Sequence, residues 1–189
     1  MADNPLDKEY YDLPKLEFIP ALPTAWKWGV ISALFGIVNL LVYFVLDIDF
    51  MNTKWLQWVG TIPMLVFLYL MFRDHKTQHL QGYLPVTRAL KLAVLMGLVM
   101  GLLTAIFNYL YFAYINPNAV TAMIDVAEKA MEQQELPEDK IEEAMKMTTY
   151  FINPLVLSLS GIISTPLMTT IFGLIVALFM RKDIPEIKQ

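Results

Sequence analysis

Four long apolar runs constrain the fold of this chain more than any other feature of its sequence. They cover residues 29–48, 55–72, 89–115 and 155–180 and carry almost no charge over their central turns. A helix needs roughly 20 residues to cross a hydrocarbon core of about 30 Å, because it rises about 1.5 Å per residue. Lipid offers no partners to the backbone, which favours helices. The sequence therefore predicts an all-α, polytopic membrane protein with four transmembrane helices.

Composition supports this prediction and excludes several other classes of protein. The 189 residues suffice for one domain, and 57% hydrophobic side chains with a mean hydropathy of +0.49 are too apolar for a soluble fold of that size. The chain has no cysteine, which excludes disulfides and thiol catalysis. Its formal net charge is -4, and its aromatic side chains cluster inside the apolar runs. Nucleic-acid binding is therefore not expected.

Lysine and arginine are distributed unequally on the two sides of the predicted spans. Ten lie on the side that holds both termini and the loop between the second and third spans, and four lie on the other side. The positive-inside rule therefore places both termini in the cytoplasm. We expect residues 27–182 to form the membrane domain and residues 183–189 a short tail. Residues 1–26 form an interfacial segment, with disorder as the alternative.

Small residues recur four positions apart within the spans, a spacing that lets two helix backbones approach closely in lipid. The pairs are Gly97/Gly101, Ser32/Gly36, Gly161/Thr165 and Gly173/Ala177. Packing within one bundle is the simpler interpretation of these pairs, and homodimerisation is the alternative.

Prolines interrupt two of the predicted spans. Pro63 in the second span and Pro166 in the fourth predict kinks, because each removes a backbone hydrogen bond. The fourth span is also rich in serine and threonine, so the two kinked helices could line the polar pathway of a small oligomeric channel or transporter. The spans carry no central Asp, Glu, Lys, Arg or His, which argues against ion-coupled transport.

The loop between the second and third spans holds both histidines of the chain. His75 and His79 are four residues apart, but two ligands make a weak metal site, and we expect no metal or cofactor. Arg88 and Lys91 share one face of a helix start and could meet lipid headgroups, an attraction of about 1 kcal/mol each near an anionic surface. We interpret the loop as a solvated segment that sets the topology.

Residues 117–153 predict an extracytoplasmic amphipathic helical hairpin between the third and fourth spans. Its apolar residues recur at helical spacing, and eight acidic residues against three lysines give it a formal charge of -5. Asn116-Pro117 and Asn153-Pro154 each look like a helix start, with Asn as the N-cap and Pro in the first turn. The methionine-bearing stripes could dock a partner, or they could pack on each other and on the membrane face.

Short motifs in a characteristic order run from residue 27 to residue 182. They include Lys27-Trp28-Gly29, Arg73-Asp74, Gly82-Tyr83, Arg88-Ala89-Leu90-Lys91, Gly97/Gly101, Asn108-Tyr109, Ile115-Asn116-Pro117, Ile141-Glu142 and Pro154. In this order and spacing the chain resembles domain-of-unknown-function family 4199. The resemblance implies a four-span protein of the bacterial inner membrane. It implies no assigned activity, and therefore no functional residues to transfer.

We expect a non-enzymatic interaction or accessory protein of the membrane. The sequence lacks a nucleophile, base or metal constellation near an interface, which argues against an enzyme that acts on lipid. Apart from the lipid bilayer, the expected partner is another membrane protein or a second copy of the chain. A small oligomeric channel or transporter is the alternative.

Overall fold

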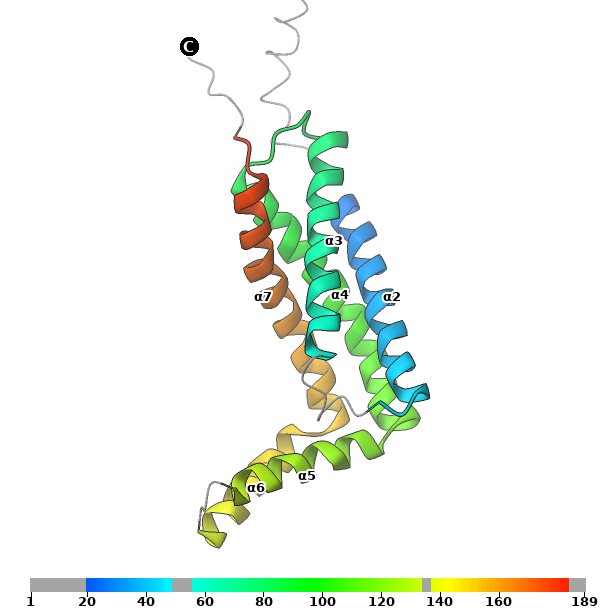
Figure 1. The fold of residues 1–189 in the computed structure, drawn as a ribbon, viewed down its shortest axis with the longest axis vertical. Coiled ribbons are helices and arrows are strands. Elements are labelled where there is room, and N and C mark those ends of the chain that lie inside the picture. Colours follow the sequence, from blue (N-terminus) through cyan, green and yellow to red (C-terminus); the bar gives the residue numbers. More distant parts are fainter. Residues whose placement is uncertain (1–19, 49–55, 134–136, 184–189) are drawn as a thin grey trace, which may run out of the picture.

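The structure is a computed structural model that describes residues 20–48, 56–133 and 137–183, and the regular elements among them are helices (Figure 1). In chain order they are α2 (Leu22–Val45), α3 (Leu56–Gln78), α4 (Val86–Leu110), the π-helix η2 (Tyr111–Ile115), α5 (Asn118–Glu132), α6 (Glu138–Phe151) and α7 (Pro154–Met180).

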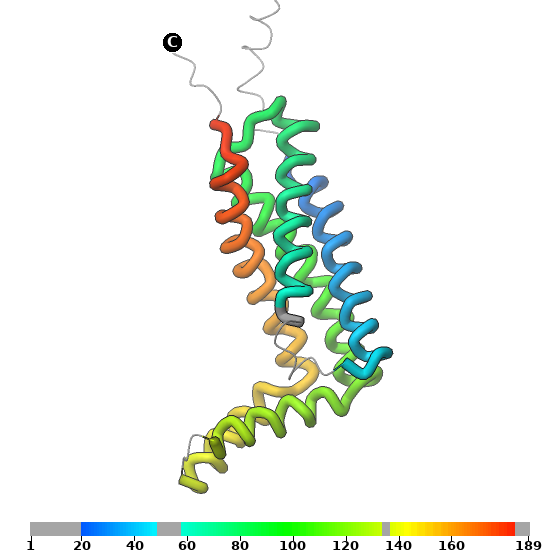
Figure 2. The backbone as a smooth tube through the Cα atoms, in the orientation of Figure 1, coloured from blue at the N-terminus to red at the C-terminus, as the bar shows by residue number. Residues whose placement is uncertain are grey.

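Helices α2, α3, α4 and α7 lie side by side in an elongated bundle, with α2 and α4 running in one direction and α3 and α7 in the other (Figures 1 and 2). Helix α4 packs most extensively on α7 and also on α2, whereas α3 lies against α7 and α2. The start of α2 and the end of α7 lie at one end of the bundle. Helices α5 and α6 pack on each other and project from the opposite end, and we call them the α5–α6 arm.

Three helices are long and apolar enough to cross a membrane: Leu22–Val45, Val86–Ile115 and Pro154–Met180. They correspond to the first, third and fourth predicted spans. The second predicted span, residues 55–72, forms most of α3, but α3 is not among the three. Its last turns carry the charged and polar sequence from Arg73 to Lys76, which lowers the average hydropathy of the described helix.

Helix α2 begins seven residues before the apolar run that predicted it, at Leu22. Pro23 lies in its first turn, where the N–H that proline lacks has no partner within the helix. Residues 22–26, which we assigned to the interfacial segment, are therefore helical. The rest of that segment up to residue 19, and the tail from residue 184, lie outside the described residues.

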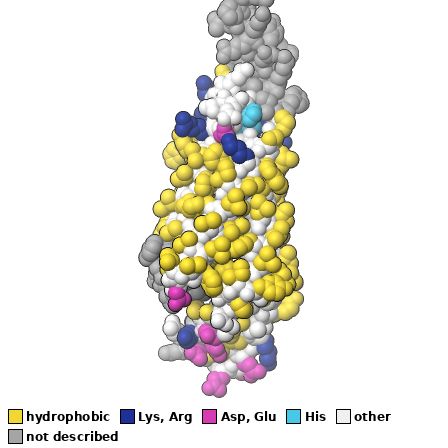
Figure 3. Space-filling view, turned by 90° about the vertical axis from the view of Figure 1, so that its right-hand side faces the viewer, with side chains coloured by type: hydrophobic (Ala, Val, Ile, Leu, Met, Phe, Trp, Pro, Cys, Tyr) yellow, Lys and Arg dark blue, Asp and Glu magenta, His cyan; other side chains and the backbone are white. Residues whose placement is uncertain are grey.

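The buried core is concentrated at the end of the bundle where α3 leads into α4. Leu68, Met71, Phe72, Leu92 and Met96 are fully buried there. Along the outer faces of the spans, by contrast, large apolar side chains cover the surface (Figure 3). An exposed apolar surface of this extent is typical of a helix bundle surrounded by lipid.

Candidate functional site

The chain between α3 and α4 is held in the core. Leu80 and Leu84 are each 1% exposed, and His75 near the end of α3 is fully buried. Gly82 turns the chain between the two leucines with a φ of +88°, which glycine adopts without strain. Our interpretation of this loop as a solvated segment is therefore wrong for these three residues, whereas His79 and Gln81 between them are exposed. Helix α3 extends beyond its apolar run, and the two leucines fix the remaining turn on the bundle.

His75 links α3 to α2. Its Nδ1 lies 2.9 Å from Thr24 Oγ1, a hydrogen bond between residues 51 positions apart. Burial, with the nearby positive charge of Arg88, lowers the pKa of His75 from 6.5 to about 4. The imidazole is therefore neutral near pH 7. The rings of His75 and His79 lie 5.2 Å apart, and no group of three possible metal ligands occurs among the described residues.

Asp74 makes a second link between α3 and α2. Its Oδ2 accepts hydrogen bonds from Lys27 Nζ at 2.8 Å and from Trp28 Nε1 at 2.9 Å. Burial alone would raise the pKa of Asp74, but the two hydrogen bonds and the charge of Lys27 outweigh it and lower that pKa. The carboxylate therefore stays ionised and holds the start of α2 against the end of α3.

The end of α7 closes the same part of the bundle. Leu84 and Lys182 exchange two backbone hydrogen bonds, of 2.7 and 3.2 Å. Lys76 Nζ donates to the carbonyl of Met180 at 2.7 Å, and Lys182 Nζ lies 4.8 Å from the centre of the Tyr83 ring. The α3–α4 connection is thereby tied to the last residues of the membrane domain.

We call this group of linked side chains the polar end. It comprises Thr24, Lys27, Asp74, His75, Lys76 and Lys182. The two predicted headgroup ligands lie beside it. Lys91 is exposed, whereas Arg88 is half-buried and its charge acts on His75.

The predicted glycine pair of α4 lies in the contact with α7. A Cβ atom on Gly97 would lie 2.6 Å from Pro166 Cα, and one on Gly101 would lie 3.1 Å from the carbonyl oxygen of Gly161 and 3.3 Å from Thr165 Cβ. The absence of side chains therefore lets the two helices approach closely. This face of α4 is used inside the bundle, so a homodimer through the same face would have to displace α7.

The other small residues separate into packed and open positions. Ser32 is 3% exposed, but a Cβ on Gly36, one turn later, would meet no atom within 4 Å. Gly29 and Gly173 approach α4 closely, since their Cβ atoms would lie 2.8 Å from Val99 Cβ and 2.6 Å from that of Ala93. The sequence pattern included Gly173, through the pair Gly173/Ala177, but it missed the packing role of Gly29, because nothing in the local sequence distinguishes Gly29 from Gly36.

The prolines Pro63 and Pro166 lie inside the continuous helices α3 and α7. The hydroxyls of Ser158, Thr169 and Thr170 donate to carbonyls three or four residues earlier in α7, at 2.6 to 3.0 Å. These hydroxyls thus bond within their own helix. The channel or transporter interpretation, which needs them as a polar lining, gains no support from this geometry.

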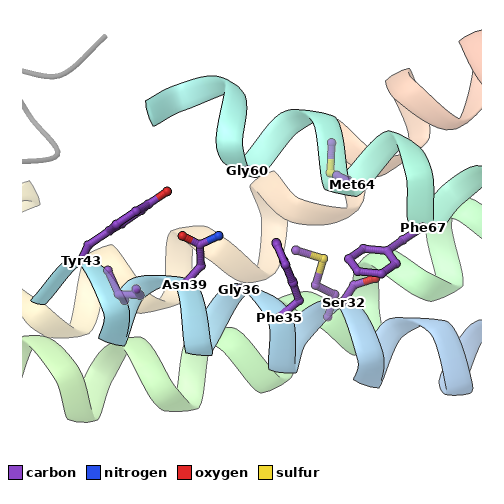
Figure 4. Close-up of a pocket in the computed structure, with 10 residues that line it drawn as sticks. Ser32, Phe35, Gly36, Asn39, Tyr43, Gly60, Met64 and Phe67 are labelled. Carbon is purple, nitrogen blue, oxygen red and sulfur yellow. The ribbon is translucent and has the colours of Figure 1, made fainter. Parts of the chain in front are cut away.

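A groove of about 260 Å³ lies between α2 and α3 (Figure 4). Phe35 from α2 and Phe67 from α3 bound it with an edge-to-face contact, their ring centres 5.5 Å apart. Space is left because Gly36 and Gly60 carry no side chains, and a Cβ on either would meet no atom within 4 Å. The lining residues of this α2–α3 groove are Ser32, Phe35, Gly36, Asn39, Leu40, Tyr43, Gly60, Met64, Phe67 and Met100.

Two polar groups of the groove have no partner among the described residues. Ser32 Oγ is buried without a hydrogen bond. The Asn39 side chain, which leaves α2 toward the groove, likewise forms no hydrogen bond within the described part of the chain (Figure 4). An unpaired polar group at membrane depth is unfavourable by itself. These two residues therefore mark the groove as a place where a ligand could supply hydrogen-bonding atoms.

A larger cavity of about 690 Å³ lies where α2 ends and η2 leads into α5. The π-turn η2 places Tyr111 in the interior, where its ring lies 6.0 Å from that of Phe44. Asn116 Nδ2 donates to Tyr111 Oη at 3.1 Å. Single π-turns within α-helices occur frequently at functional sites. The lining of this α2–α5 cavity is Leu40, Tyr43, Phe44, Asp47, Ile48, Tyr111, Phe112, Asn116, Asn118, Ala119, Ala122 and Met123.

The two Asn-Pro pairs differ in structure although they are alike in sequence. Asn153 is the N-cap of α7, its Oδ1 accepts from the backbone N–H of Val156 at 3.0 Å, and Pro154 is in the first turn. Asn116 ends η2 instead, and Pro117 occupies the N-cap position of α5 without a side-chain hydrogen bond. The predicted capping role of Asn116 is wrong, because its amide binds Tyr111.

The α5–α6 arm leaves its apolar side chains accessible. None of its described residues is buried, and Val126, Met147, Tyr150 and Phe151 are among the exposed large apolar side chains. Acidic side chains and a few lysines gather on the arm, whereas other lysines and arginines lie near the polar end (Figure 3). The arm is therefore both acidic and amphipathic.

A family model described as a protein of unknown function, DUF4199, matches residues 27–182. No curated protein and no solved structure matches the chain.

Proposed function

The chain belongs to the DUF4199 family of proteins of unknown function, and from this starting point we propose that it is a non-enzymatic accessory protein of the membrane. In this proposal the α5–α6 arm binds a second membrane protein that has a basic surface next to the bilayer. One observation carries the proposal: both arm helices are amphipathic, yet none of their described residues is buried.

The topology that we propose has four spans, with α3 as the second. Helix α3 supports this count by lying within the bundle beside three helices that are each able to cross a membrane. The start of α2 and the end of α7 lie at the same end of the bundle, which an even number of spans requires. With the positive-inside rule, this topology places the termini in the cytoplasm and the arm outside a bacterial inner membrane.

The charge and the apolar surface of the arm indicate what kind of partner fits it. Its formal charge of -5 complements a basic surface and would repel an acidic one. Met147 and Tyr150, at 63% and 71% exposure, provide adaptable and amphipathic contact area of the kind enriched at protein interfaces. A membrane protein with a basic, partly apolar outer surface would match both properties.

Mild crosslinking in cells followed by mass spectrometry of the purified protein tests this proposal. We expect one partner in stoichiometric amount with the wild-type protein and with Met147→Leu, and its loss with Met147→Glu. Both variants change the same exposed side chain, so a difference between them reports on the apolar contact rather than on folding. Recovery of the protein as a homo-oligomer alone would contradict the proposal.

A further inference from the structure

The α2–α3 groove and the α2–α5 cavity adjoin each other. Leu40 and Tyr43 line both of them. The groove extends along the part of α2 that is predicted to lie within the membrane, and the cavity lies beside the last turns of that helix and beyond its end. Because they share these two residues, we treat them as one elongated site that runs from membrane depth to the end of the bundle that carries the arm.

The chemistry of the lining changes along this site. The groove is bordered by Phe35, Met64 and Phe67, and its unpaired polar groups are Ser32 Oγ and the Asn39 amide. The cavity adds the amides of Asn116 and Asn118 and the carboxylate of Asp47. An apolar section therefore continues into a section that accepts hydrogen bonds and carries negative charge.

Asp47 is placed at the cavity by the way α2 ends. It follows the helix with a φ of 51°, the left-handed conformation that Asp tolerates better than most residues. Its backbone N–H donates to the carbonyl of Phe44 at 3.3 Å, which closes the last turn. The carboxylate is thus held at the boundary between the predicted span and the exterior.

We propose that this site binds a lipid with an ammonium-bearing headgroup. An acyl chain would occupy the α2–α3 groove and extend toward Ser32, with the Asn39 amide bonding to polar atoms of the lipid backbone. The ammonium would lie beside Asp47 in the α2–α5 cavity, where a carboxylate favours it over an anionic headgroup.

The size of the site also favours a lipid over a protein segment. Its two parts together fall within the roughly 300–1,000 Å³ of small-molecule sites. The groove alone has about 260 Å³, and a transmembrane helix with its side chains is about 10–12 Å across. A partner helix would therefore need α2 and α3 to separate.

Photo-crosslinking in lipid nanodiscs tests the proposal. The full chain is reconstituted in phosphatidylglycerol with a trace of a phosphatidylethanolamine or phosphatidylglycerol probe that carries a photoreactive acyl chain. We expect both probes to label peptides of α2 and α3, and the ethanolamine probe to label about tenfold more, equivalent to about 1.4 kcal/mol. In Asp47→Asn this preference should disappear.

Matched variants separate binding from folding. Gly36→Leu fills the groove and should lower labelling by both probes about tenfold. Gly161→Leu is the control, because a Cβ at either glycine meets no atom within 4 Å but Gly161 does not line the groove. Asn39→Leu should lower labelling while raising thermal stability, since it removes an unpaired amide. A purely structural role of Asn39 would instead lower stability.

Three results would overturn this proposal. One is labelling that Gly36→Leu leaves unchanged or that maps outside α2 and α3. Another is equal labelling of the wild-type protein by the phosphatidylethanolamine and phosphatidylglycerol probes. The third is a crosslink from the groove to a second polypeptide, which would identify a protein as the occupant. The proposal does not depend on the role of the arm, so either can fail while the other stands.

Discussion

The polar end and the arm-bearing end of the bundle are built in opposite ways. At the polar end, His75 and Asp74 of α3 bind side chains of α2, and Lys182 pairs with the α3–α4 turn. At the other end, the arm buries none of its described residues, and the α2–α5 cavity lies beside it. Fixed contacts are thus concentrated where we place the cytoplasm. The opposite end keeps surface available for binding.

The largest difference in stability is expected between substitutions of two glycines, one in each of these regions. Gly173→Leu should destabilise the bundle by about 3 kcal/mol or prevent its assembly, because its Cβ would lie 2.6 Å from Ala93 Cβ. Gly36→Leu, which enters open space, should leave stability nearly unchanged. Thermal unfolding in detergent, followed by circular dichroism, measures both variants. An equal loss of stability in the two variants would show that the groove is filled by the protein itself.

Acidification should weaken the polar end through His75. The pKa of this side chain is ordinarily 6.5 and falls to about 4 in the fold, so between these values the unfolded chain binds a proton that the folded chain does not. Stability is fully present above pH 6.5 and falls toward pH 4, by up to about 3 kcal/mol. Unfolding of wild type and His75→Phe is compared across this range. If stability changes with pH equally in both proteins, groups other than His75 cause the pH effect.

Ion pairs should also differ in strength between the two ends. Asp74→Asn should cost about 1 to 2 kcal/mol, because Lys27 and Trp28 both bind a carboxylate whose side chain is only 13% exposed. Glu142→Gln removes an equally short contact to Lys146, but both side chains are 74% exposed, so no measurable change is expected. Chemical denaturation of each variant in mixed micelles provides the comparison. A larger loss of stability in Glu142→Gln than in Asp74→Asn would contradict this prediction.

The smallest effect on stability is expected for apolar side chains of the arm. Replacing Tyr150 by Ser should leave the unfolding temperature of the isolated protein unchanged, because the side chain is 71% exposed. Its effect should appear in partner capture instead. A clear drop in the unfolding temperature would mean that the arm packs against the bundle more closely than its exposure indicates.

Hydropathy was sufficient to predict three of the four spans, because the apolar runs are long and nearly free of charge. It could not predict that α3 extends past Phe72, since Asp74 and Lys76, which follow the apolar run, bind residues far away in the sequence. The burial of His75 depends on Thr24, 51 positions earlier, and no local pattern reports that contact. Sequence therefore predicted the helices better than the links between them.

The candidate site was harder to predict for a related reason. Glycines that allow close packing, such as Gly29, and glycines that leave space, such as Gly36, occur in the same helix with similar neighbours. Their roles depend on which face meets α4. The two Asn-Pro pairs show the same limit: Asn153 caps α7, while Asn116 is diverted to Tyr111 by the preceding π-turn. In each case the role of a glycine or an asparagine depends on which residues the fold brings next to it.

The π-turn at Tyr111–Ile115 also determines the direction in which the arm leaves α4. A π-turn fits one more residue into a turn than an α-helix does, and each residue of an α-helix advances the chain by about 100° around the axis. Shortening the chain by one residue here would rotate the start of α5 around the axis of α4 by about that angle. A single deletion or insertion could thus re-aim the arm toward a different neighbour while the packing of α4 on α7 stayed intact.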